Sequence, residues 1–184
     1  ADVSGKGIPA ALMMSNVQAS IRTMIRNTED LQKIVEELNY QINLRGLSER
    51  FVSMFICIYD FNSKFLEYIN CGHPHPLLAH GKDIVSLDRG STVLGMFPNL
   101  PKIKTTKIKI LRGFDLFSYT DGLVETQNGY GDFYGSSKIK KLFEGKRKDP
   151  ENFIELVKDD LDDFKGNNIS YDDTTLLMIS VRNV

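Results

Sequence analysis

Tryptophan is absent from this chain of 184 residues, which also has only two cysteines and no excess of charge of either sign. Its 23 basic and 24 acidic residues are interspersed along the chain and give a formal net charge of −1. No basic stretch therefore stands out that would bind nucleic acid or an anionic membrane surface. We expect a protein or a small molecule as the partner, and no nucleic acid.

Long apolar runs are also lacking. None approaches the roughly 20 residues that are needed to span a bilayer. The opening residues, ADVSGKG, have no charged-then-apolar pattern of a signal peptide. We therefore expect no membrane segment in this chain and a cytoplasmic location.

The two cysteines, Cys57 and Cys71, do not have the Cys-x-x-Cys spacing of a zinc or redox site. They fall in two neighbouring predicted strands, and free cysteine in folded proteins is ordinarily buried. We interpret both as reduced thiols of the core.

The sequence does contain enough apolar material for one core, because 41% of its residues are hydrophobic and its length suits a single domain over 1–184. Apolar residues at helical spacing predict helices over 9–25, 31–46, 137–145 and 150–166. Aromatic and β-branched runs predict strands over 51–60, 64–72, 76–80, 83–87, 102–110, 115–120 and 174–184. Because the strands are grouped between pairs of helices, we predict α+β layers with largely antiparallel sheets.

Carboxylates stand at the ends of several predicted elements. Asp2 opens the chain, Asp121 follows an apolar strand, and Asp172 and Asp173 precede the last strand. Oxygen ligands of this kind suit hard divalent cations if the fold brings such ends together. Taken singly, an Asp beside Gly is more often a turn residue, so spacing alone leaves both interpretations open.

The segment DVSGKG also has some features of a phosphate-binding loop, because Gly5 and Gly7 precede a predicted helix. The Walker pattern, however, requires G-x-x-x-x-G-K-[ST], and here no hydroxyl residue follows Lys6. Lys6 is either a residue that approaches phosphate or a solvated loop lysine.

Four segments occur in the order that characterises one protein family. ADVSGKGIPAALMM resembles GDVSGKG-x-PAALM, CGHPHPLL resembles AGHPPPLL, YTDGLVE resembles TDGVxE, and DDTTLL resembles DDxTLL. The chain thus resembles the PP2C-like (PPM) metal-dependent serine/threonine phosphatase domains of the SpoIIE/RsbU type. The resemblance extends from Asp2 to Leu177, nearly the whole chain.

This resemblance implies an α-β-β-α sandwich with two manganese or magnesium ions at one edge. Asp2 would be a bridging ligand with the backbone carbonyl of Val3 beside it, and Asp121 and Asp172 would be carboxylates at the second ion. Asp172 is favoured over Asp173 as the ligand, but a shift by one residue is compatible with the sequence, so Asp173 stays an alternative. Asp2, Asp121 and Asp172 would be the catalytic residues.

The implied reaction is two-metal hydrolysis of phosphoserine or phosphothreonine, without a covalent phospho-enzyme. By resemblance the substrate is an anti-sigma-factor antagonist of the STAS type, in partner-switching signalling that an upstream sensory domain controls. The helices predicted over 9–25 and 31–46 would transmit the regulatory signal, or they are simply core helices.

His73 and His75 are candidates for a metal ligand or for an acid that protonates the leaving oxygen. The prolines of the HPHP turn favour the simpler interpretation, in which both histidines shape the fold.

One part of the family pattern has no counterpart. A further metal-binding aspartate lies upstream in this family, in a GGDxYD-like motif, and no such motif precedes Ala1 in the sequence. We therefore expect a domain that lacks its first strands and has an incomplete metal site. Two hypotheses stay open: a phosphatase, and a non-catalytic regulatory module that binds a partner. The exposed strand edge also predicts a homodimer or a swapped assembly.

Overall fold

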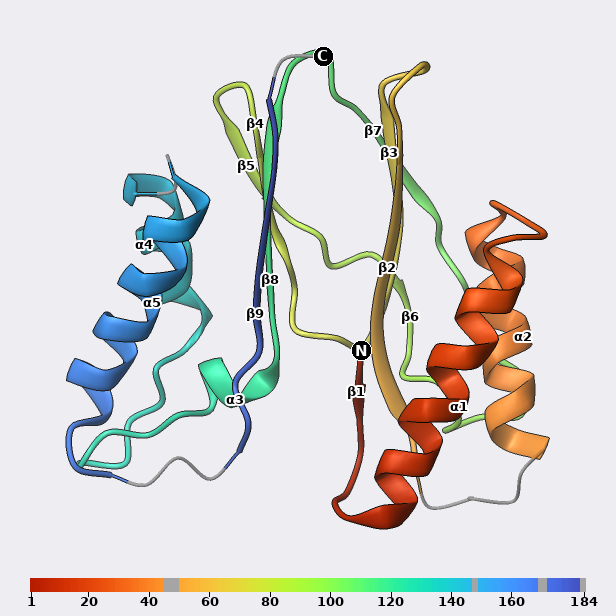
Figure 1. Cartoon of the computed structure of the whole chain (residues 1–184), viewed down its shortest axis with the longest axis horizontal. Coiled ribbons are helices and arrows are strands. Elements are labelled where there is room, and N and C mark those ends of the chain that lie inside the picture. Colours follow the sequence, from red (N-terminus) through yellow and green to blue (C-terminus); the bar gives the residue numbers. More distant parts are fainter. Residues whose placement is uncertain (45–49, 147–148, 169–171, 183–184) are drawn as a thin grey trace. The chain divides into compact units, whose positions relative to one another are not determined.

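The computed structural model describes residues 1–44, 50–146, 149–168 and 172–182, and the end of the helix predicted over 31–46 lies outside them. The chain forms two compact units. The first comprises Ala1–His73 and Asp88–Lys109, and the second comprises Pro74–Leu87 and Ile110–Val184. Each unit contains one sheet, with helices on one face of it (Figure 1).

The sheet of the first unit has the order β1-β2-β3-β6, with β7 also paired to β3. Its strands are β1 (Asp2–Val3), β2 (Val52–Asp60), β3 (Phe65–Cys71), β6 (Gly90–Ser91) and β7 (Thr106–Lys109). All of these pairs are antiparallel except β3 with β6. The predicted hairpin of 51–60 and 64–72 is thereby confirmed, with Met54 opposite Cys71.

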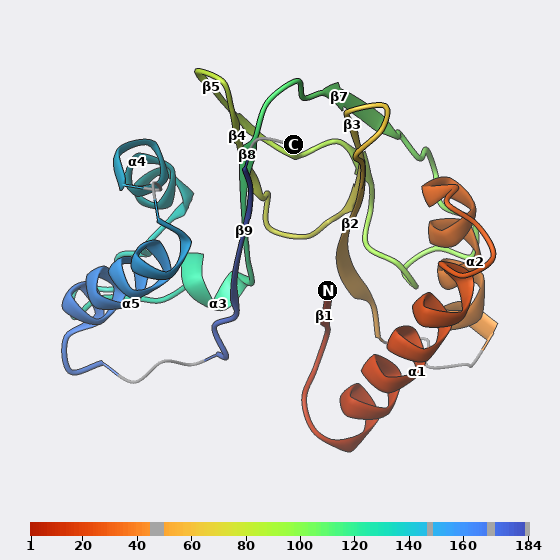
Figure 2. The same cartoon turned by 45° about the horizontal axis from the view of Figure 1, so that its top comes forward.

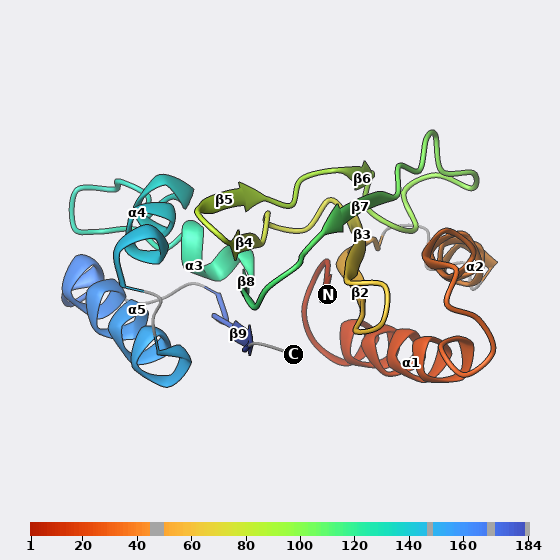
Figure 3. The same ribbon diagram turned by 90° about the horizontal axis from the view of Figure 1, so that it is seen from above.

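Helices α1 (Ile8–Met24) and α2 (Leu31–Leu44) lie side by side on one face of this sheet (Figures 1 and 3). α1 has Pro9 in its first turn, and Asp30 caps α2 by accepting hydrogen bonds from the backbone N–H groups of Gln32 and Lys33. The core between helices and sheet is apolar; its members include Val3, Val17, Ile34, Leu38, Val52, Met54, Ile69 and Cys71.

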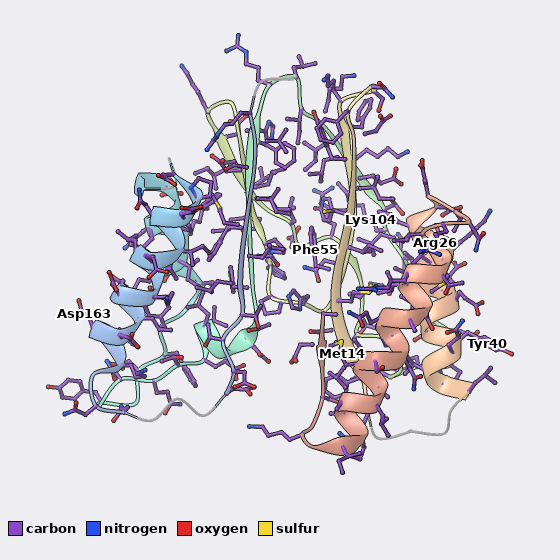
Figure 4. All side chains as sticks on the ribbon, viewed as in Figure 1. Met14, Arg26, Tyr40, Phe55, Lys104 and Asp163 are labelled. Atoms are coloured by element: carbon purple, nitrogen blue, oxygen red, sulfur yellow. The ribbon has the colours of Figure 1, made fainter. Side chains whose placement is uncertain are left out.

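Alternation along β2 sends every second side chain to the other face of the sheet. Phe55 projects from β2 on the side away from the two helices, whereas Met14 of α1 is on the core side (Figure 4). The ring of Phe55 lies 5.8 Å from that of Tyr68, centroid to centroid.

The sheet of the second unit is antiparallel throughout, with the order β5-β4-β8-β9. Its strands are β4 (Leu77–His80), β5 (Asp83–Ser86), β8 (Phe114–Tyr119) and β9 (Leu176–Val181). Strand β8 is an inner strand, as its apolar sequence predicts. Helices α4 (Ser136–Lys146) and α5 (Pro150–Lys165) cover one face of the sheet, and the short α3 (Asp121–Val124) directly follows β8 (Figure 2).

An aromatic cluster forms the core of this unit. Phe117 of β8 contacts Phe143 of α4 and Phe153 of α5, with ring centroids 6.1 and 5.0 Å away. Offset and edge-on contacts of this kind add to the free energy gained by burying the rings. Pro150 opens α5, as the sequence predicts, and the side chain of Asp149 caps the helix by accepting a hydrogen bond from the backbone N–H of Glu151.

The mixed α+β fold with largely antiparallel sheets is confirmed. Three short elements were not predicted, namely β1, β6 and α3, and β7 is shorter than the strand predicted over 102–110. The assignment of 1–184 to one domain stays a prediction. Within the described segments, no helix combines the length and the apolar character needed to cross a membrane.

Candidate metal centre

Asp2 lies in β1, the short strand at the edge of the first sheet. It is opposite Ser53 of β2, and the next pair is Val3 opposite Val52. Val3 is buried in the helix-side core and Asp2 is half-buried. The apolar side chain of Val3 therefore fixes the strand that carries the Asp2 carboxylate.

The glycine-rich segment after β1 is held against the start of β2. The backbone N–H of Ser4 donates to the carbonyl of Phe51 (2.9 Å), and the N–H of Phe51 donates to the Ser4 hydroxyl (2.8 Å). The Arg50 guanidinium donates to the Ser4 carbonyl (2.9 Å), and Gly5, at φ +84°, passes so close that a Cβ would lie 2.2 Å from Arg50 Nη1. Gly5 thus permits this turn, which ends β1 ahead of α1.

His73 is buried, with 5% of its surface exposed, and belongs to the first unit. Its Nδ1 lies 3.0 Å from the Ser53 hydroxyl. Asn70 holds its backbone twice: the His73 N–H donates to Asn70 Oδ1 (2.8 Å), and Asn70 Nδ2 donates to the His73 carbonyl (3.0 Å). Burial, and secondarily the positive amino group of Ala1, lowers the pKa of His73 to about 4, so the imidazole is neutral at pH 7. His75 is exposed.

Asp121 lies in the second unit, at the first position of α3, directly after β8. Its Oδ1 accepts a hydrogen bond from the backbone N–H of Gly122 (2.9 Å). A carboxylate in the first turn of a helix is favoured there by the backbone N–H groups that point toward it.

Thr120 and Gly122 bring the TDG segment against the DDTT segment. The Thr120 N–H donates to the Thr175 carbonyl (3.1 Å), and the Thr175 N–H donates to the Thr120 hydroxyl (2.9 Å). That hydroxyl also donates to the carbonyl of Asp173 (3.3 Å). A Cβ on Gly122 would lie 2.4 Å from the same carbonyl oxygen, so only glycine allows the two segments to lie this close.

Asp172 and Asp173 are both exposed in this loop. Asp172 Oδ1 accepts a hydrogen bond from the backbone N–H of Asp173 (3.0 Å). The carbonyl of Asp173 faces Thr120 and Gly122, so this part of the loop lies beside the start of α3.

The predicted ligands thus fall into two sets, one in each unit. Asp2 and Val3 lie in the first, and Asp121, Asp172 and Asp173 lie in the second, where the TDG and DDTT segments join them. Over the described residues, no three His, Cys, Asp or Glu side chains form a ready metal cluster. The donor chemistry still fits magnesium or manganese, because every predicted ligand is a carboxylate or carbonyl oxygen.

Sequence reasoning did not single out Ser53, Asn70 or Thr120. Thr120 is the first residue of the TDG segment, and Asn70 directly precedes the CGHPHP segment. Their positions relative to these motifs could have indicated that they support the site. Ser53 gave no such signal, because it becomes part of the site only through strand pairing with Asp2.

The fold is that of PP2C phosphatase domains. The structure of the SiaA-PP2C domain of Pseudomonas aeruginosa matches 98% of this chain and 72% of its own, with a TM-score of 0.81 and 19% sequence identity. The family model described as Stage II sporulation protein E (SpoIIE) matches residues 1–182. The chain therefore belongs to the SpoIIE family.

Two curated relatives are similar in sequence. The phosphoserine phosphatase RsbU of Bacillus subtilis (strain 168) is 27% identical over 148 residues, covering 78% of this chain and 43% of RsbU. Protein IcfG of Synechocystis sp. (strain ATCC 27184 / PCC 6803 / Kazusa) is 21% identical over 206 residues, covering 97% of this chain and 32% of IcfG. The chain thus spans less than half the length of these relatives. The resemblance to the SpoIIE/RsbU type is confirmed.

Proposed function

We propose that this chain is the catalytic part of a metal-dependent protein serine/threonine phosphatase. The observation that supports the proposal is the close pairing of the TDG segment, which contains Asp121, with the DDTT segment, which contains Asp172 and Asp173. The family membership over residues 1–182 and the phosphatase name of RsbU support it.

In this proposal, Asp2 with the Val3 carbonyl, and Asp121 with Asp172, hold two manganese or magnesium ions, and Asp173 is the alternative to Asp172. Such ions supply Lewis acidity, which lowers the pKa of a water and neutralises charge on phosphoryl oxygens. The residues of the chain hold the ligands in place: β1 carries Asp2, and Thr120 fixes the loop of Asp172. Cys71 is buried in the helix-side core and Cys57 lies within β2, so the proposal uses no cysteine nucleophile.

The proposed substrate is a phosphoserine or phosphothreonine on a STAS-type anti-sigma-factor antagonist, in bacterial partner-switching signalling in the cytoplasm. An upstream sensory domain would control the activity. Similarity to RsbU supports this assignment.

The test is Mn²⁺-dependent hydrolysis of an aryl phosphate and of a phosphorylated STAS-type protein. It is made with this chain and, if the protein continues before Ala1, with the longer chain. We expect Asp2→Asn and Asp121→Asn to lower kcat by about 100-fold or more, since each removes charge that stabilises the transition state.

The matched control is Asp163→Asn, because Asp163 is an exposed carboxylate that points away from α5 (Figure 4). It should leave activity unchanged. If activity survives Asp121→Asn, the metal assignment is wrong. If the wild-type protein is inactive with every metal ion tried, the result supports a non-catalytic module instead.

A further inference from the structure

A small polar cluster occupies one face of the first sheet, beside β1. The paired Val3 and Val52 belong to the helix-side core. Their neighbours Asp2 and Ser53 therefore lie on the opposite face of the sheet. The His73 ring lies against the Ser53 hydroxyl, and Asp2 is the residue opposite Ser53 in β1.

Asp2 and Ser53 are direct neighbours on this face. The backbone groups of Phe51 bond to Ser4 on the β1 side, whereas those of Val52 bond to Leu94 on the other side. By alternation, the N–H and C=O of Ser53 point toward β1. The Cβ atoms of such an opposed pair are about 4.5–5.5 Å apart, which puts a serine hydroxyl within reach of an aspartate carboxylate.

The backbone of His73 is held by a neighbouring side chain. Both its backbone groups bond to the side chain of Asn70, which is itself 2% exposed. Gly72, at φ +70°, lets the chain turn so close to Val93 that a Cβ would lie 2.5 Å from Val93 Cγ1. These constraints fix the backbone of His73, and the ring Nδ1 lies 3.0 Å from the Ser53 hydroxyl.

We propose that His73 is a positioning residue for Asp2 and acts through Ser53. Its Nδ1–H donates to Ser53 Oγ, so the Ser53 hydroxyl proton is directed to the Asp2 carboxylate. A hydrogen bond of this kind orients a metal-binding carboxylate and limits the rotamers that it adopts. The inference rests on the proposed function, in which Asp2 is a metal ligand.

The first test needs no metal. Nitrogen-15 NMR of the three imidazoles shows which ring nitrogen carries the proton, and His73→Asn identifies the resonances of His73. We expect protonated Nδ1 and unprotonated Nε2. The opposite tautomer, in which Nδ1 accepts the Ser53 hydroxyl proton, would overturn the positioning role, because no proton would then be left for Asp2.

The second test is Mn²⁺ affinity by calorimetry. Ser53→Ala and His73→Gln should weaken binding by about 10- to 100-fold, the usual effect of losing a hydrogen bond to a ligand. His73→Asn places an amide N–H near the position of Nδ1 and should retain most of the affinity, which a purely steric role for the ring would not predict.

The matched control is Ser91→Ala. Ser91 belongs to the same unit, and its buried hydroxyl has no hydrogen-bond partner among the described residues, so Mn²⁺ affinity should not change. Wild-type affinity in Ser53→Ala would overturn the positioning role alone. A wild-type chain that binds no Mn²⁺ would overturn the proposed function, and with it the role of Asp2.

Discussion

The close packing of the TDG segment against the DDTT segment requires glycine at position 122. A Cβ there would lie 2.4 Å from the Asp173 carbonyl oxygen and 3.2 Å from the Thr174 hydroxyl. We expect Gly122→Ala to lower the free energy of unfolding by about 1–3 kcal/mol, the usual cost of overpacking. Urea denaturation followed by circular dichroism measures this change.

The control for this prediction is Gly145→Ala, in α4. Apart from the adjoining backbone of α4 itself, no described atom lies within 4 Å of the Cβ that it would add, so alanine should be neutral or should stabilise the helix by up to about 1 kcal/mol. Equal effects of the two substitutions would show that packing between the TDG and DDTT segments is not the cause.

His73 should make the stability of the chain depend on pH. Burial lowers its pKa to about 4, from 6.5 in an exposed histidine, so below pH 6.5 the unfolded chain binds a proton that the folded chain does not. Stability is therefore complete above about pH 6.5 and falls as the pH drops toward 4, by about 1.4 kcal/mol per pH unit.

Between pH 6.5 and 5, this contribution is about 2 kcal/mol. Urea denaturation of wild type and His73→Asn at both pH values measures it, because the loss that carboxylates cause at low pH is common to both chains. We expect a smaller loss in His73→Asn. The same loss in both would contradict a neutral, buried His73.

At the residue scale, the sequence singles out the candidate carboxylates but not the groups that hold their segments in place. Asp121 and Asp172 stand in recognisable segments at element ends, and the structure joins their segments through Thr120. Ser53 has no motif of its own, because its place beside Asp2 depends on the register of two strands about 50 residues apart in sequence.

At the scale of the elements, the two edges of the first sheet, at β7 and at β2, differ in how readily they could pair with a strand of another chain. β7 is an edge strand with the exposed Lys107 and Lys109, which discourage pairing with another chain. β2 has no lysine or proline, and within the described residues β1 covers its outer side only at Val52 and Ser53. Phe55 and Cys57, whose backbone groups point outward by alternation, have no strand beside them there.

We therefore expect this chain to form dimers through the β2 edge, with a mass that rises with concentration in light scattering. Cys57→Pro removes one outward N–H without changing the pairing of β2 with β3, and should shift the chain toward monomer. Cys57→Ala keeps the N–H and should behave as wild type. A monomeric wild type over a wide concentration range would exclude this assembly.

The helices and the long hairpins were predictable because each has a repeating pattern of several turns or strand residues. α1, α2 and α5 agree with their predicted ranges to within a few residues where the structure describes them. β1, with two residues, and α3, with four, are too short to have a period, and only tertiary pairing defines them. β7 is short because β3 offers it partners only from Phe65 to Tyr68.

On the scale of the whole molecule, the composition and the grouping of strands were sufficient to predict α+β layers. The composition and the strand pattern did not predict that the strands divide between two compact units. Residues 74–87 belong to the second unit, whereas residues 88–109, which follow them in sequence, belong to the first. That division depends on which strands pair, and a strand pattern does not specify its partner. The same division separates Asp2 from Asp121, so the metal assignment needs a test that involves both units.

Cooperative unfolding provides that test. If 1–184 is one domain, hydrogen exchange by mass spectrometry in increasing urea should give one midpoint for peptides of α2 and of α5, which lie in different units. If Asp2 and Asp121 bind the same ions, Mn²⁺ at 100 times its Kd should stabilise both sets of peptides equally, by about 2.7 kcal/mol. Asp2→Asn and Asp121→Asn should each remove this gain from both units, whereas Asp163→Asn should not. Two separate midpoints would contradict the single domain, and a gain confined to one unit would mean that the carboxylates of the other unit do not bind the ions.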